Sequence, residues 1–99
     1  MSLEQTIKQI NHFRDERNWR PHHNAKDLAI SISLEAAELL EDFQWVSAEE
    51  GIAKNLENIK EEIADVLIYT LMLSDNLGLD VETIIADKLK KNAIKYPVK

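Results

Sequence analysis

Two pairs of acidic residues share one spacing: Glu35 with Glu38, and Glu62 with Asp65. A separation of three residues places both members of a pair on the same face of an α-helix, one turn apart. Carboxylate oxygens are the ligands that hard divalent cations prefer, so the four acids predict a Mg²⁺ site, with Mn²⁺ as the alternative ion. Zinc is not expected, because it prefers nitrogen and sulfur ligands.

The residues around both pairs are almost entirely apolar. Segment 28–40 reads LAISISLEAAELL, and segment 63–73 reads IADVLIYTLML with one charge. A surface helix normally spreads several charges over its solvated face. Carboxylates in such apolar helices would repel one another and lose hydration unless a cation or protons neutralised them. The alternative interpretation is that these acids simply face solvent, as closely spaced acids do on many helices.

A helical projection extends each pair into a stripe of residues on one face. Trp45 shares the stripe of the first pair, and Tyr69 lies one turn beyond the second pair. Both side chains are therefore candidates to contact a ligand held at the acids. The alternatives are that Trp45 packs at a helix end and that Tyr69 sits at the edge of the core.

Four helices must position these residues, because the 99-residue chain has helical periodicity and only two Gly and two Pro. We expect helices at about 3–17, 27–45, 47–76 and 81–94, with a loop at 18–26. Ser47 and Glu50 fit a capping box, Gly51 is expected to divide the third stretch, and Gly78 is expected to end it. Short connections predict an all-α, four-helix bundle-like fold in one domain, residues 1–99.

The composition excludes several classes of function. The 18 acidic and 12 basic residues give a formal net charge of −6, which argues against binding to a nucleic-acid polymer. The absence of cysteine excludes disulfides, thiolate metal sites and a Cys nucleophile. Neither a signal peptide nor a run of roughly 18 apolar residues is present, so we expect a cytoplasmic protein without a membrane partner.

Three segments carry a family resemblance: SLEAAELLEDFQW, EEIADVLIYTLML and KLKKNAIKYP. The first two hold E-x-x-E and E-x-x-D pairs, and together the three resemble the MazG-type nucleotide pyrophosphohydrolases of the all-α NTP pyrophosphatase superfamily. The opening segment FRDERNWRPHHNAKDL is similar to the dCTP pyrophosphatase branch. Many members have two adjacent acids at the first position, whereas Leu34 precedes Glu35 here, a departure that this branch tolerates.

The resemblance implies Mg²⁺-dependent hydrolysis of a nucleoside triphosphate to the monophosphate and pyrophosphate. It implies that the four acids bind the metal and that one of them, with Glu38 favoured over Glu35, orients or deprotonates the water. The implied nucleotide contacts are Trp19, His23, Trp45, Tyr69, Lys88, Asn92, Lys95 and Tyr96. By pattern alone, a solvated helix end is the better explanation of the lysines, and His23 equally fits solvent exposure.

The apolar residues that four helices leave uncovered, together with the resemblance, predict a homodimer or a homotetramer built from two dimers. The pocket would then lie between protomers. Two alternatives stay open for the function. One is hydrolysis of phosphoribosyl-ATP or dUTP within the same superfamily. The other is a non-catalytic helical oligomerisation or binding module.

Overall fold

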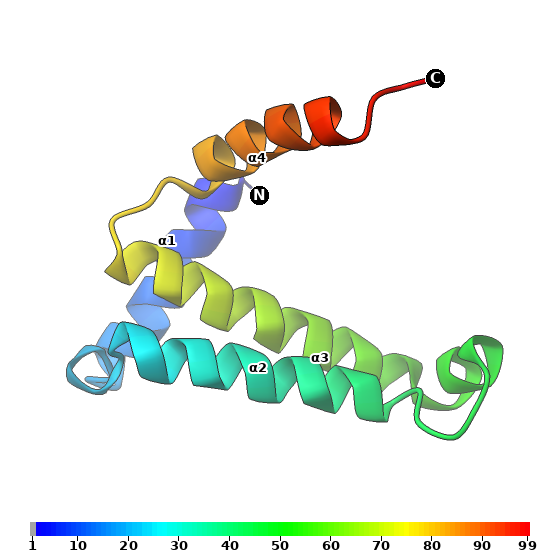
Figure 1. Ribbon diagram of the computed structural model, residues 1–99. Helices are drawn as coiled ribbons and strands as arrows, with labels where there is room; N and C mark the ends of the chain where they lie inside the picture. The colour runs from blue at the N-terminus through cyan, green and yellow to red at the C-terminus, as the bar shows by residue number, and fades with distance from the viewer. Residues whose placement is uncertain (1) are drawn as a thin grey trace.

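The computed structural model describes residues 2–99, so Met1 of the expected domain lies outside the description. Its elements are α1 (Leu3–Glu16), the 3₁₀-helix η1 (Arg20–His22), α2 (Ala25–Glu41), α3 (Ala48–Asn76) and α4 (Val81–Lys95). The all-α prediction with four helices is confirmed, since these described residues form no strand. The helices α2 and α3 run antiparallel as a central pair (Figure 1). Helix α1 lies across the C-terminal end of α3, and α4 extends away from α2.

Polar caps fix the predicted ends of α3 and the start of α4. The Ser47 hydroxyl accepts the Glu50 N–H at 3.2 Å, which confirms Ser47 as the cap. Gly78 has a φ of +66°, and the Leu79 N–H donates to the Ser74 carbonyl at 2.9 Å. This is a Schellman end, which explains why glycine stands there. Helix α4 begins at Val81, and the Asp80 carboxylate caps it by accepting the Thr83 N–H at 3.0 Å.

The predicted second helix is wrong at both ends. It begins at Ala25, because the Asn24 side chain caps it by accepting the Asp27 N–H at 2.9 Å. It ends at Glu41, four residues early. Trp45 has a φ of +65° and lies in the connection to α3, so it does not share the helical stripe of the acids.

Gly51 does not divide the third helical stretch, contrary to the prediction. It is buried within α3, where an added Cβ would lie 2.6 Å from Phe43 Cδ1 and 3.0 Å from the Asp42 carbonyl oxygen. Glycine is therefore needed for the close approach of α3 to the end of α2. The kink that divides this stretch lies instead at Asn55, with non-helical φ −122° and ψ 19°, so the expected division occurs four residues later. The Asn55 amide nitrogen donates to that same Asp42 carbonyl at 2.8 Å.

The described chain is open for its length. Its radius of gyration is 16.2 Å, whereas a compact domain of 100 residues has about 13 Å. In the part of the chain that the structure describes, only Leu28, Ile59 and Met72 are buried apolar side chains. An apolar groove of about 680 Å³ runs between α1, α3 and α4. Among residues 2–99, no helix is both long enough and apolar enough to cross a bilayer.

Candidate metal and nucleotide site

The antiparallel packing of α2 and α3 brings the two acidic pairs together. Carboxylate oxygens of Glu35, Glu62 and Asp65 lie within 4.8 Å of one another, and all three residues are half-buried. Glu38 is exposed and adds its charge to those of Glu35 and Glu62. The prediction that the two pairs converge is confirmed in geometry for three of the acids, with Glu38 at the rim.

Crowding of like charges perturbs this cluster. The pKa of Glu35 is raised to about 7, first by the adjacent Glu38 carboxyl, then by burial and by the charges of Asp65 and Glu62. The pKa of Glu62 is also raised, first by loss of hydration and then by Glu38. Such shifts mean that it is unfavourable for all of these acids to be ionised together without a cation.

One oxygen of the cluster lacks any donor in the described part of the chain. Glu35 Oε2 is buried and has no hydrogen-bond partner there. A divalent cation would give this oxygen a partner and would neutralise its neighbours. The donor set consists only of carboxylate oxygens, which fits Mg²⁺ or Mn²⁺ and does not fit zinc.

Tyr69 lies close to the acids along α3, whereas Trp19 and His23 lie at one end of the central helix pair. Tyr69 is half-buried on α3, one turn beyond Asp65. Trp19 and His23 lie in the connection between α1 and α2, with ring centroids 5.8 Å apart and an edge-to-face arrangement. Asn76, which bonds the His23 carbonyl, stands about 16 Å along α3 from Asp65 at the helical rise per residue.

The remaining predicted contacts are not brought to the acids within one chain. Trp45 is 96% exposed at the opposite end of α2 from His23. The other four are Lys88, Asn92, Lys95 and Tyr96, which α4 and its C-terminal end carry away from α2 (Figure 1). The single chain therefore presents the acids without these residues.

Comparison with known proteins identifies the family. The profile of the MazG-like family matches residues 30–99, which include all four acids. The chain belongs to the MazG-like family. This confirms the resemblance read from the sequence.

This MazG-like chain is similar to two groups of known proteins. It is 35% identical to rat dCTP pyrophosphatase 1 over 91 residues, covering 87% of this chain and 54% of that protein. It is 31% identical to the human dCTP pyrophosphatase 1, covering 86% and 53%. The chain thus spans about half the length of these curated relatives. A crystal structure of a pyrophosphatase from Archaeoglobus fulgidus is 42% identical with a TM-score of 0.91, covering 97% of this chain and 93% of that one.

Two residues of this MazG-like chain matter more than their sequence context indicated. Asp42 is only 9% exposed, its Oδ2 lacks a partner in the described chain, and its charge raises the pKa of Glu62. Its position one turn after Glu38 was the available signal. Arg14 is completely buried. The signal for it was a charge at helical spacing on the apolar face of α1.

Proposed function

We propose that this MazG-like protein is a nucleoside triphosphate pyrophosphohydrolase that needs Mg²⁺, or Mn²⁺ in its place. It would convert a (d)NTP and water to the (d)NMP and pyrophosphate, by hydrolysis of an acid anhydride. The observation that carries the proposal is the set of three carboxylates within 4.8 Å on two largely apolar helices. The pyrophosphatase names of the relatives, from rat to Archaeoglobus fulgidus, support it.

The four acids would have different roles in this reaction. Glu35, Glu62 and Asp65 would hold the cation, because their oxygens already converge. Glu38 stands exposed beside them and would accept the proton of the attacking water. The bound cation would supply charge neutralisation and Lewis-acid polarisation at the triphosphate. The pKa of Glu35 is raised to about 7, so the positive charge would favour the ionised form of this carboxyl.

We propose a deoxycytidine triphosphate-like substrate and a role in cleaning the nucleotide pool. The names of the rat and human relatives support this choice of base. In this chain, Trp19 and His23 would form one side of the base pocket.

We further propose that the active form is a homodimer or a dimer of dimers. Large apolar side chains on both central helices are exposed, including Leu34 at 62% and Leu67 at 55%. A second copy would cover them and would bring Trp45, Lys88, Asn92, Lys95 and Tyr96 of one protomer toward the acids of the other. A monomeric mass in solution at micromolar concentration would contradict this assembly.

The test is a panel of canonical and modified dNTPs and NTPs, dUTP and phosphoribosyl-ATP included, with Mg²⁺ and identification of the products. We expect pyrophosphate and the monophosphate, with dCTP among the best substrates. Release of orthophosphate would contradict the reaction type. No turnover of any nucleotide would favour the non-catalytic binding module. Turnover only of phosphoribosyl-ATP or dUTP would reassign the substrate within the superfamily.

Two matched variants test the site itself. Glu38→Gln should lower kcat by about 100-fold or more, the usual contribution of a positioned base. Glu61→Gln removes a charge from an exposed position of α3, next to Glu62, and should keep wild-type activity. Full activity in Glu38→Gln would remove that residue from the proposed mechanism.

A further inference from the structure

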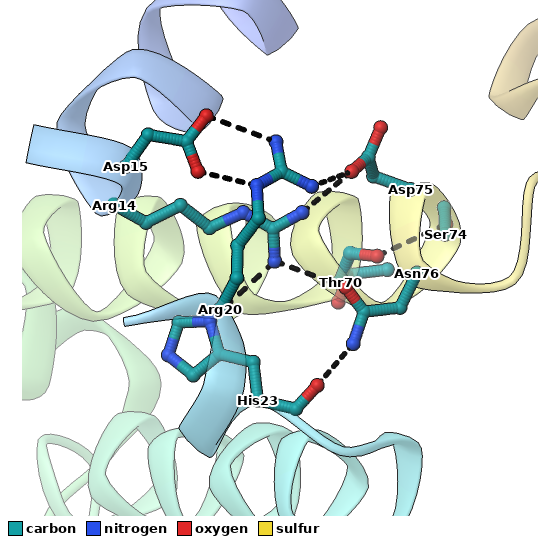
Figure 2. Close-up of polar contacts among 8 residues, drawn as sticks. All are labelled: Arg14, Asp15, Arg20, His23, Thr70, Ser74, Asp75 and Asn76. Carbon is teal, nitrogen blue, oxygen red and sulfur yellow. Dashed lines mark hydrogen bonds and ion pairs between the residues drawn. The ribbon is translucent and has the colours of Figure 1, made fainter. Parts of the chain in front are cut away.

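A buried guanidinium joins three elements at the end of the central helix pair. Arg14 has no exposed surface, which is rare for arginine. Its Nη2 bonds Asp75 Oδ2 at 2.5 Å, and its Nη1 donates to Asn76 Oδ1 at 3.1 Å (Figure 2). Arg20 bonds the same Asp75 oxygen at 2.9 Å and also pairs with Asp15. The network therefore fastens α1 and η1 to the last turn of α3.

The same guanidinium also faces an imidazole. Arg14 Nη1 lies 3.4 Å from His23 Nδ1. A guanidinium can only donate hydrogen bonds, so Nδ1 must be the acceptor and the ring proton must sit on Nε2. Asn76 holds the backbone of the same residue, because its amide nitrogen donates to the His23 carbonyl (Figure 2). Ring and backbone of His23 are thus both fixed by residues of this network.

The surroundings of His23 favour the neutral ring. Burial lowers the pKa of His23, and the positive charges of Arg14, His22 and Arg20 lower it further. The carboxylate of this network on α3, Asp75, is engaged by the Arg14 and Arg20 guanidiniums. These surroundings favour the uncharged imidazole, which has one N–H to donate.

That N–H stands beside an accessible aromatic ring. In the described residues, Arg14 is the single hydrogen-bond partner of the His23 ring nitrogens, which leaves Nε2–H unused. Trp19 packs edge-to-face on His23, is braced by Phe13 at 5.5 Å, and is 37% exposed. A donor next to an indole suits a planar heterocycle that presents a carbonyl oxygen or an unprotonated ring nitrogen.

We propose that Arg14, held by Asp75 and Asn76, is a positioning residue that fixes His23 as its Nε2–H tautomer, so that His23 donates to an acceptor on the nucleotide base. This inference rests on the proposed function and deepens it. It assigns base selection to a network at the end of the central helix pair, apart from the four acids. Arg14 acts through His23 and does not contact the substrate.

Substitutions at His23 test the tautomer by chemical mimicry. The amide nitrogen of His23→Gln can reach the position of Nε2, whereas the shorter His23→Asn can reach only that of Nδ1. We expect His23→Gln to raise KM for dCTP by about threefold and His23→Asn by about tenfold, the worth of one hydrogen bond. The two variants should share a kcat, because the acids lie elsewhere on α2 and α3. Equal KM values for the two variants would overturn the proposal.

A double-mutant cycle separates positioning from simple packing. Arg14→Gln should raise KM by about fivefold to tenfold alone, and by less than about twofold in the His23→Gln background. Arg14→Lys keeps the charge beside Asp75, but its single nitrogen cannot occupy the positions of both Nη1 and Nη2. It replaces Arg14→Gln if that variant does not fold. Arg17→Gln, at the same end of α1 and stacked over Phe13, is the control that should keep the wild-type KM. An equal Arg14 effect in both backgrounds would overturn the inference.

A spectroscopic measurement decides the point without turnover. Long-range ¹H–¹⁵N spectra of the full chain should show an unprotonated Nδ1 and a protonated Nε2 for His23, with both tautomers present in Arg14→Lys. Titration with dCMP should shift the His23 Nε2–H resonance. A protonated Nδ1 in the wild type, or no shift of His23 with dCMP, would overturn the proposal. A wild-type protein that shows the shift but hydrolyses no nucleotide would refute the proposed function alone.

Discussion

Replacing Glu35 by Gln should stabilise the metal-free protein. The substitution keeps the size of the side chain, removes one negative charge, and supplies an amide that can donate to a neighbouring carboxylate. The pKa of Glu35 is about 7 instead of 4.5, first because of Glu38 and then because of burial. At 1.36 kcal/mol per pKa unit this corresponds to about 3 kcal/mol. Glu35 is partly hydrated, and screening reduces the expected gain at pH 8 to about 1–2 kcal/mol.

The gain must depend on pH in one direction. Below pH 4.5, Glu35 is protonated in both the folded and the unfolded chain, so its charge costs nothing. Between 4.5 and about 7 the unfolded chain releases the proton while the folded chain keeps it, and the wild type loses stability as the pH rises. Above about 7 the loss is complete and constant. The difference between Glu35→Gln and the wild type should therefore grow across this window and then level off.

Thermal unfolding at fixed protein concentration, in EDTA, from pH 4 to pH 8.5 measures this difference. At pH 8 the Tm of Glu35→Gln should exceed that of the wild type by about 4–8 °C for each kcal/mol. Saturating Mg²⁺ should make the wild type the more stable of the two. Its Glu35 carboxylate binds the ion, whereas the amide of the Glu35→Gln variant binds it poorly. Glu61→Gln controls for the loss of a negative charge at an exposed position of α3. A Glu35→Gln protein no more stable than the wild type at pH 8 in EDTA would refute the electrostatic reasoning.

Three further predictions follow from single contacts. Asp75→Asn should lower the free energy of unfolding in urea by about 3 kcal/mol, because buried Arg14 loses its anionic partner; a loss under about 1 kcal/mol would contradict this account. Gly51→Ala should cost about 1–3 kcal/mol in the same assay through its clash with Phe43, and unchanged stability would mean that the ring gives way freely. Trp45→Ala should leave Tm unchanged, since the side chain is 96% exposed, but raise KM for dCTP if a partner protomer's substrate stacks on it. An unchanged KM would remove Trp45 from the site.

Local patterns in the sequence were enough to predict most helix ends. Ser47 and Gly78 act within one turn of the chain, through a hydroxyl that caps an N–H and a left-handed glycine. The position of Gly51 shows where such rules end. Glycine has poor helix propensity, yet here it lies inside α3, because only a hydrogen fits against Phe43. That requirement comes from a contact between elements.

Sequence alone determined the all-α class and the candidate metal ligands, because helical spacing places paired acids on one face whatever the packing. Only the tertiary structure decided how the acids differ. Antiparallel packing of α2 on α3 converged Glu35, Glu62 and Asp65, left Glu38 at the rim, and buried an unpartnered oxygen of Glu35. The tertiary structure also places the Trp45 side chain in solvent. It builds the Arg14 network by joining Arg14 to Asp75 and Asn76, which lie more than 60 positions away in the chain. Such long-range contacts depend on how helices cross, which no local pattern of side chains specifies.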